Sequence, residues 1–187
     1  MRIVGTILGL VILGILTAVL FIYSGWYDVA ASKPHLALTW HLLHTTMERS
    51  VAVRAADIQP PDLSGQDLIK KGAEHYHRNC AVCHGAPGIP PGKIGQGLMP
   101  RPPELAKKAG EWTSAELYWI VKHGIKMTGM PAWGKTHKEE DLWAIVAFTK
   151  RLPNMSANEY RQWVPDASAS RGNERADRAA SSTTHSR

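Results

Sequence analysis

The sequence predicts an all-α protein in which one apolar N-terminal helix precedes a small helical module. Three observations support this prediction. Residues 3–23 form an uncharged apolar run, residues 62–153 carry helix-start patterns with apolar residues at helical spacing, and no segment alternates for long enough to form a strand. The chain has 187 residues, so only one compact domain is expected after the apolar run.

The apolar run at the N-terminus is long enough to cross a membrane. At about 1.5 Å of rise per residue, residues 3–23 span a hydrocarbon core of about 30 Å. Arg2 precedes the run, which favours a cytoplasmic N-terminus and export of the chain that follows. The alternative is a cleaved signal peptide with Val29-Ala30-Ala31 as its cleavage site. An uncleaved anchor is favoured because the run exceeds the usual signal core.

Composition and turn signals predict five parts along the chain. In order, they are an anchor over 1–25, a helical connector over 26–61, a module over 62–153, a short packed extension over 154–165 and a disordered tail over 166–187. The tail is expected to lack order because it contains no Val, Ile, Leu, Met or aromatic residue to bury.

One capping pattern marks the helix starts in the module and its extension. A hydroxyl residue is followed three residues later by an acidic residue, and together they satisfy free backbone N–H groups at a helix N-terminus. The pattern begins at Ser64, Thr113, Thr136 and Ser156. Each of these residues is therefore expected to begin a helix, and Pro153 is expected to end the third.

Residues 80–84 form the motif Cys-x-x-Cys-His, with Cys80, Cys83 and His84 as its fixed positions. Two cysteines at this spacing lie one helical turn apart, so both thiols can add to the vinyl groups of one haem, and the histidine can ligate the iron. A zinc site is disfavoured because a second ligand pair at zinc spacing is missing, and a thioredoxin-like pair because no strand precedes the motif. The motif predicts one covalent haem c.

The second axial ligand of such an iron decides its function. A thioether raises the reduction potential, whereas an open position allows oxygen or peroxide chemistry. Met99, Met127 and Met130 follow the motif within the module. Met130 is favoured because Gly129 lets the backbone approach closely and Pro131 stiffens the loop. Met99, which also precedes a proline, is the alternative.

The order of these motifs resembles a class I monohaem cytochrome c. The likeness covers roughly 62–153. Within this range the sequence is similar to the membrane-anchored bacterial type found as haem c modules of cbb-type oxidases. It rests on Gly72-x-x-x-Tyr76, the haem motif, Gly129-Met130-Pro131 and a C-terminal aromatic helix. The resemblance implies a small all-α fold around the haem, with Gly72 and Tyr76 packed against the helix that bears Trp143 and Phe148. It also implies a proline carbonyl as hydrogen-bond partner of His84; the candidates are Pro90, Pro91 and Pro100.

The resemblance implies an electron carrier rather than an enzyme, either free or as a subunit of a larger complex. It is expected in a bacterial inner membrane, with its haem domain in the periplasm. The expected partner is a redox protein with an acidic surface, because Lys122, Lys126, Lys135 and Lys138 lie near Met130 with no acidic residue among them. A solvated lysine-rich loop is the alternative for these lysines. No nucleic acid and no small-molecule substrate are expected. The alternative function is a haem-based sensor or a small peroxidase with an open sixth position.

Overall fold

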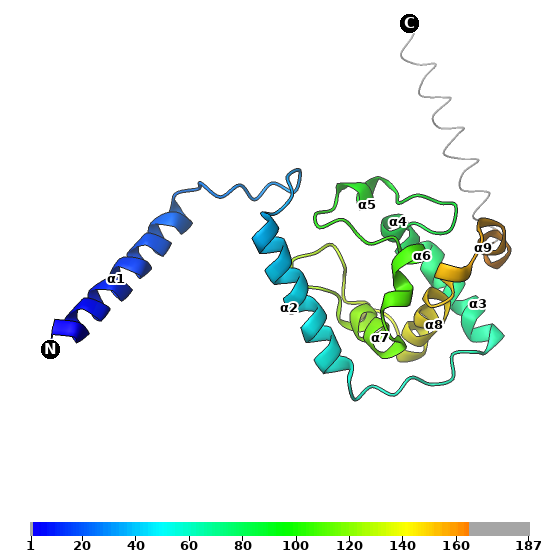
Figure 1. Ribbon diagram of the computed structural model, residues 1–187. Helices are drawn as coiled ribbons and strands as arrows, with labels where there is room; N and C mark the ends of the chain where they lie inside the picture. Colours follow the sequence, from blue (N-terminus) through cyan, green and yellow to red (C-terminus); the bar gives the residue numbers. More distant parts are fainter. Residues whose placement is uncertain (1, 165–187) are drawn as a thin grey trace, which may run out of the picture. The chain divides into compact units, whose positions relative to one another are not determined.

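The computed structural model describes residues 2–164, and the predicted tail over 166–187 lies outside this range. The chain divides into a first unit that ends at Lys33 and a second that begins at Pro34. Among the described residues all regular elements are helical, and the single β-contact is an isolated bridge between Ala86 and Ile89 (Figure 1). The all-α fold class is therefore confirmed.

The first unit contains one helix, α1 (Arg2–Tyr23), which is long and apolar enough to cross a membrane. None of its side chains is buried in the protein, so its apolar surface has no internal partner. This agrees with the predicted membrane helix. An N-terminal signal sequence has the same properties, so length and composition alone do not separate the two.

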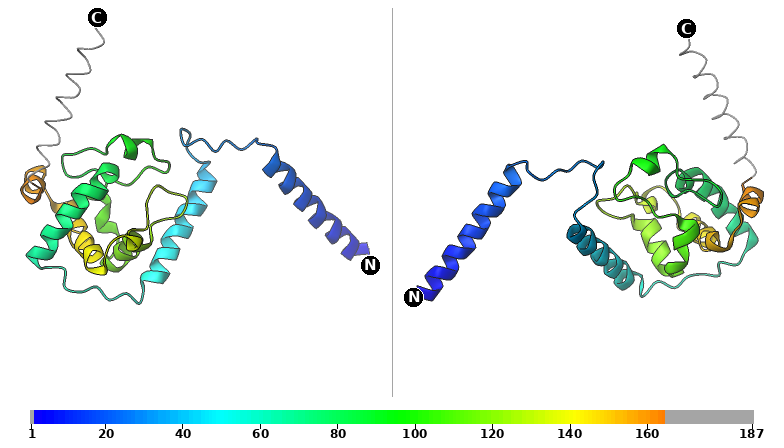
Figure 2. Two further views of the ribbon diagram at one scale, coloured as in Figure 1. Left: turned by 180° about the vertical axis from the view of Figure 1, so that it is seen from behind. Right: turned by 45° about the horizontal axis from the view of Figure 1, so that its top comes forward.

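The second unit is a bundle of short helices (Figures 1 and 2). In chain order they are α2 (Ala37–Ala55), α3 (Gln66–His75), a π-helical turn (Tyr76–Cys80), α4 (Ala81–His84), α5 (Lys93–Gly97), α6 (Leu105–Lys108), a 3₁₀ turn (Ala109–Glu111), α7 (Ser114–His123), a 3₁₀ turn (Trp133–Lys135), α8 (Glu139–Thr149), a 3₁₀ turn (Leu152–Asn154) and α9 (Ala157–Trp163). Helix α2 packs on α7, and α3 packs on α8.

The centre of the bundle is the crossing of α3 and α8. Every α8 residue from Leu142 to Thr149 is buried. Gly72 lies directly against the backbone of Ala144, and the Tyr76 ring lies 5.6 Å from that of Phe148. The packing predicted for Gly72 and Tyr76 is confirmed.

Two of the four predicted helix caps form. The hydroxyls of Thr113 and Ser156 each accept a hydrogen bond from the N–H three residues later, and the acidic partner closes both capping boxes. The caps predicted at Ser64 and Thr136 were wrong. Helix α3 begins after Gly65, and the Thr136 hydroxyl donates to the carbonyl of Trp133. The helix N-cap is Gly65, one residue after Ser64, in the first case and Lys138, two residues after Thr136, in the second.

Helix α9 packs back onto the bundle, as expected for the extension. Tyr160 is fully buried, and its hydroxyl lies 3.0 Å from Nδ1 of His77. The rings of Tyr160 and Trp163 lie 6.0 and 6.4 Å from that of Phe148. Helix α9 therefore closes the side of α3 that leads into the haem motif.

His75 at the α3–α8 crossing predicts a pH-dependent stability. Burial is the main cause that lowers the pKa of His75 from its usual value of about 6.5, although Asp141 lies 3.7 Å away and opposes the shift; His137, Arg78 and Lys71 add to the lowering. A folded-state pKa below the unfolded one means that the unfolded chain binds more protons as the pH falls through 6.5. The free energy of unfolding is therefore expected to decrease between pH 7 and pH 5. Urea unfolding of wild type and His75→Gln at both values tests this, because an equally steep decrease in the variant would exclude His75 as its source.

Candidate haem site

The Cys-x-x-Cys-His motif lies where α3 runs through a π-helical turn into α4. This single wide turn ends at Cys80, and such turns occur often at functional sites. Cys80 is buried, Cys83 is half-buried and both thiols are free. Burial raises the pKa of the Cys80 thiol to about 12, with a smaller contribution from Cys83. Helix α4 ends at Gly85, whose φ of 67° suits glycine, so the chain turns away directly after His84.

His84 is held by the loop before α6. Its Nδ1–H donates to the carbonyl of Pro103 at 2.9 Å, which leaves Nε2 as the nitrogen with a free lone pair. Burial lowers the pKa of His84, and the hydrogen bond to Pro103 opposes this shift. The lowered pKa favours the neutral imidazole that a metal requires. The proline carbonyl implied by the resemblance is therefore present, but it belongs to Pro103 and not to the candidates named above.

The segment after the motif packs tightly around it. The hydroxyl of Tyr76 donates to the carbonyl of Gly85 at 2.8 Å, and the N–H of Gly92 donates to the carbonyl of Val82 at 2.9 Å. Gly95 in α5 lies directly against the backbone of Cys83. These contacts hold the attachment helix from both ends.

Met130 lies in a hydrogen-bonded loop between α7 and α8. The N–H of Ile125 donates to the carbonyl of Met130 at 3.3 Å, and the N–H of Met130 donates to the hydroxyl of Thr128 at 3.1 Å. The Thr128 hydroxyl in turn donates to the carbonyl of Ile125 at 2.8 Å. The side chain of Met130 is half-buried against the core. Thr128, which the sequence analysis did not single out, is the residue that closes this loop.

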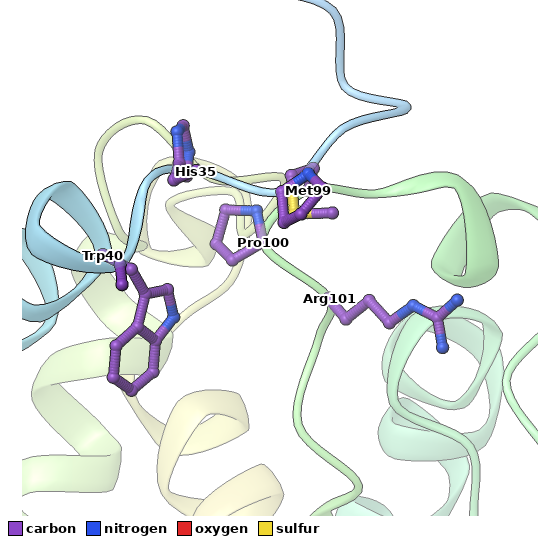
Figure 3. A pocket seen from close by; sticks show the side chains of 7 residues that line it. His35, Trp40, Met99, Pro100 and Arg101 are labelled. Carbon is purple, nitrogen blue, oxygen red and sulfur yellow. The ribbon is translucent and has the colours of Figure 1, made fainter.

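The other two methionines have different surroundings. Met127 is 76% exposed and has a positive φ of 61°, so it lies at the loop tip in water. Met99 is half-buried and lines a cavity of about 550 Å³ between its own loop and the start of α2, together with Trp40 and Pro100 (Figure 3). The neighbouring Leu98 lies against Gly129, so the loops of Met99 and Met130 touch.

The donor set of this region fits a covalently held haem. It offers two free thiols one turn apart, a neutral imidazole oriented through its other nitrogen, and a half-buried thioether on an ordered loop. The tight packing around Cys83 and His84 fixes the positions of the attachment groups. Sulfur and imidazole are the ligands that haem iron takes in low-spin electron-transfer proteins.

Comparison with known proteins gives the family of the segment that holds this site. Residues 67–148 match the family model described as cytochrome C oxidase, cbb3-type, subunit III. This segment is a class I cytochrome c module. No curated protein matches the chain.

The cytochrome module carries covalently bound haem c and acts in electron transfer. The matched range contains the Cys-x-x-Cys-His motif and the loops of Met99 and Met130. Helices α2 and α9 lie outside the matched range. Val51 of α2 and Tyr160 of α9 are nevertheless buried, so both helices contribute residues to the core of the folded unit. The predicted family and cofactor are confirmed.

Proposed function

We propose that this protein is a membrane-tethered carrier that moves single electrons on the periplasmic side of the membrane. Cys80 and Cys83 form the two thioether bonds, His84 ligates iron through Nε2 and Met130 is the second axial ligand. The observation that carries the proposal is the hydrogen bond from His84 to Pro103, which orients the imidazole as a ligand. Bound haem c supplies an iron that accepts and releases one electron.

Met130 is the favoured second ligand because its loop is already fixed before any metal bond forms. Three hydrogen bonds among Ile125, Thr128 and Met130 hold the backbone, so ligation costs little additional ordering. Met127 is exposed at the loop tip, and Met99 lies beside the α2 cavity. Met99 remains the alternative ligand.

The apolar helix α1 supports a tether, and Arg2 at its start supports a cytoplasmic N-terminus. A tether raises the local concentration of the module near membrane partners. Together with the family, this supports a redox partner in the membrane, with the protein either free or as a subunit of an oxidase complex.

Replacing Met130 by alanine tests the ligand assignment. The wild-type protein is expected to be low-spin, with the weak sulfur-to-ferric absorption band and no carbon monoxide binding. In Met130→Ala the band is expected to disappear, the ferrous form to bind carbon monoxide, and the potential to fall by roughly 0.1 V or more, within the span of about 0.8 V that axial ligands cover. Ferric and ferrous spectra and a redox titration measure all three.

Met127→Ala and Met99→Ala are the matched controls. Met127→Ala is expected to leave the spectrum unchanged because that side chain lies in water. A loss of the band in Met99→Ala, but not in Met130→Ala, would transfer the assignment to Met99. If the wild-type protein is high-spin and binds carbon monoxide, the proposed electron-carrier function is overturned in favour of a sensor or a small peroxidase.

The lysines near the Met130 loop are proposed to dock an acidic partner. Lys126, Lys135 and Lys138 are exposed, whereas Lys122 donates to the hydroxyl of Tyr118 at 3.0 Å. This hydroxyl donates in turn to the Glu139 carboxylate at 2.7 Å. Lys122 is therefore held at Tyr118 near the Glu139 carboxylate, and the other three lysines carry the proposed attraction.

Reversing two of these charges is expected to slow electron transfer. In the double variant Lys126→Glu and Lys135→Glu, the rate with an isolated cbb-type oxidase is expected to fall about fivefold or more at low ionic strength, and less in high salt. Stopped-flow oxidation measures this. Lys70→Glu with Lys107→Glu, on α3 and α6, changes the net charge equally outside the loop. An equal loss in this control would show that total charge alone matters.

A further inference from the structure

The first half of α2, with the residues just before it, is poor in charged residues. From Pro34 to Met47 the chain has no Asp, Glu, Lys or Arg. Its large apolar side chains are nevertheless exposed: Leu36 by 67%, Leu38 by 69%, Trp40 by 49%, Leu42 by 57% and Leu43 by 40%. A helical surface in water normally carries charged and polar residues. The polar residues of this segment are three threonines and three histidines, of which His44 lies 3.3 Å from Glu48, so the exposed leucines lie among polar side chains without Lys, Arg, Asp or Glu.

The second half of the same helix has the opposite character. Val51 and Ala55 are buried against the module, and charged residues begin at Glu48. Arg54 is held by hydrogen bonds to Ser50, as on an ordinary solvated surface. Residues with charged side chains therefore begin near Met47 along the length of α2, and they are not confined to one face of the helix.

Apolar side chains of the first half point to more than one side of the helix. Leu36, Trp40 and Leu43 follow the three- and four-residue spacing of the face that ends in Val51. Trp40 lines the cavity beside Met99 on that side (Figure 3). Leu38 and Leu42, four residues apart, share a different face. The side of Trp40 and Val51 is turned toward the module, so Leu38 and Leu42 are the apolar side chains left on another face, and a membrane interface takes up one face of a helix.

The chain itself connects this surface to a membrane helix. Helix α1 ends at Tyr23, and the link to Pro34 reaches at most about 35 Å when fully extended. The link begins with the exposed aromatic residues Trp26 and Tyr27, a residue type enriched at membrane interfaces. The uncharged half of α2 thus remains within reach of the bilayer surface.

We propose that residues 36–43, at the start of α2, insert into the lipid interface and dock the cytochrome module on the membrane. This inference rests on the membrane tether of the proposed function. The segment has no Lys or Arg, so apolar burial drives the insertion and anionic lipid is not required. Docking limits the orientations of the haem module, and with them the set of membrane partners that it meets.

Photocrosslinking to lipid tests the insertion with the full-length holoprotein. The protein is reconstituted in vesicles of phosphatidylcholine alone, with Leu38→p-benzoylphenylalanine or Leu42→p-benzoylphenylalanine. Lipid adducts are expected by mass spectrometry at both positions. The matched control is Val53, which is 72% exposed in the charged half of the same helix and is expected to give none. Leu13 in α1 serves as the positive control for the tether.

The outcomes separate the docking from the tether. Adducts at Leu13 without adducts at Leu38 and Leu42 would overturn the docking and leave the tether standing. No adduct at Leu13 would overturn the tether, and the docking with it. Equal adducts at Val53 would show nonspecific contact and also overturn the docking. In native membranes, crosslinks from Leu38 to a protein in place of lipid would assign this surface to a subunit interface.

Discussion

Replacing Gly72 by alanine is expected to destabilise the cytochrome module strongly. A Cβ at this position would lie 1.9 Å from the carbonyl oxygen and 2.6 Å from the carbonyl carbon of Ala144. Both are backbone atoms of α8, so no rotamer change relieves the clash, and α3 must move away from α8. This crossing holds the largest part of the core, so the expected cost is about 3 kcal/mol or more. A domain of this size has a total stability of roughly 5–15 kcal/mol.

Denaturant unfolding of the holoprotein measures this cost. Lys70→Ala, in the same helix but exposed, is the matched control and is expected to change stability by less than about 0.5 kcal/mol. If Gly72→Ala matched this control in stability and haem content, the close approach of α3 and α8 would be wrong. The expectation therefore tests the fold without relying on any assignment of iron ligands.

Local chemistry made much of this protein predictable. The haem motif depends on residues that are adjacent in the chain, and the capping boxes at Thr113 and Ser156 span three residues. Gly124, with a φ of 63°, follows the last residue of α7, a position and conformation that suit glycine. Each of these features is decided within one or two helical turns, so sequence reasoning finds it.

Features that depend on distant residues were not predictable in the same way. The partner of His84 is the carbonyl of Pro103, nineteen residues later in sequence, and the sequence analysis named Pro90, Pro91 and Pro100 as candidates instead. The caps expected at Ser64 and Thr136 failed because the helices begin one and two residues later, after Gly65 and Lys138. The role of Thr128 in the Met130 loop is likewise visible only once the loop closes.

Gly95 is the second position where one methyl group is expected to have a large effect, in this case on haem attachment. A Cβ there would lie 2.5 Å from the carbonyl oxygen and 2.7 Å from the Cα of Cys83. Relief of this clash must shift either α5 or the attachment helix α4. A shift of α4 moves Cys83 and His84 together, and both are proposed to bind the same haem. Gly95→Ala is therefore expected to lower the yield of mature protein, whereas Gly72→Ala acts mainly on the core.

The ratio of haem absorbance to protein, with thioether formation read by mass spectrometry, measures the effect. A cost of about 2–3 kcal/mol, typical of overpacking, corresponds to a change of about 30- to 150-fold in the equilibrium constant for the close approach of α5 and α4. Gly97→Ala is the matched control in the same short helix, because a Cβ there meets nothing within 4 Å. Full haem loading in both variants would show that α5 yields and that α4 alone positions Cys83. Loss in Gly95→Ala only, with single-thioether species accumulating, would identify the contact between α5 and Cys83 as the one that positions the second attachment.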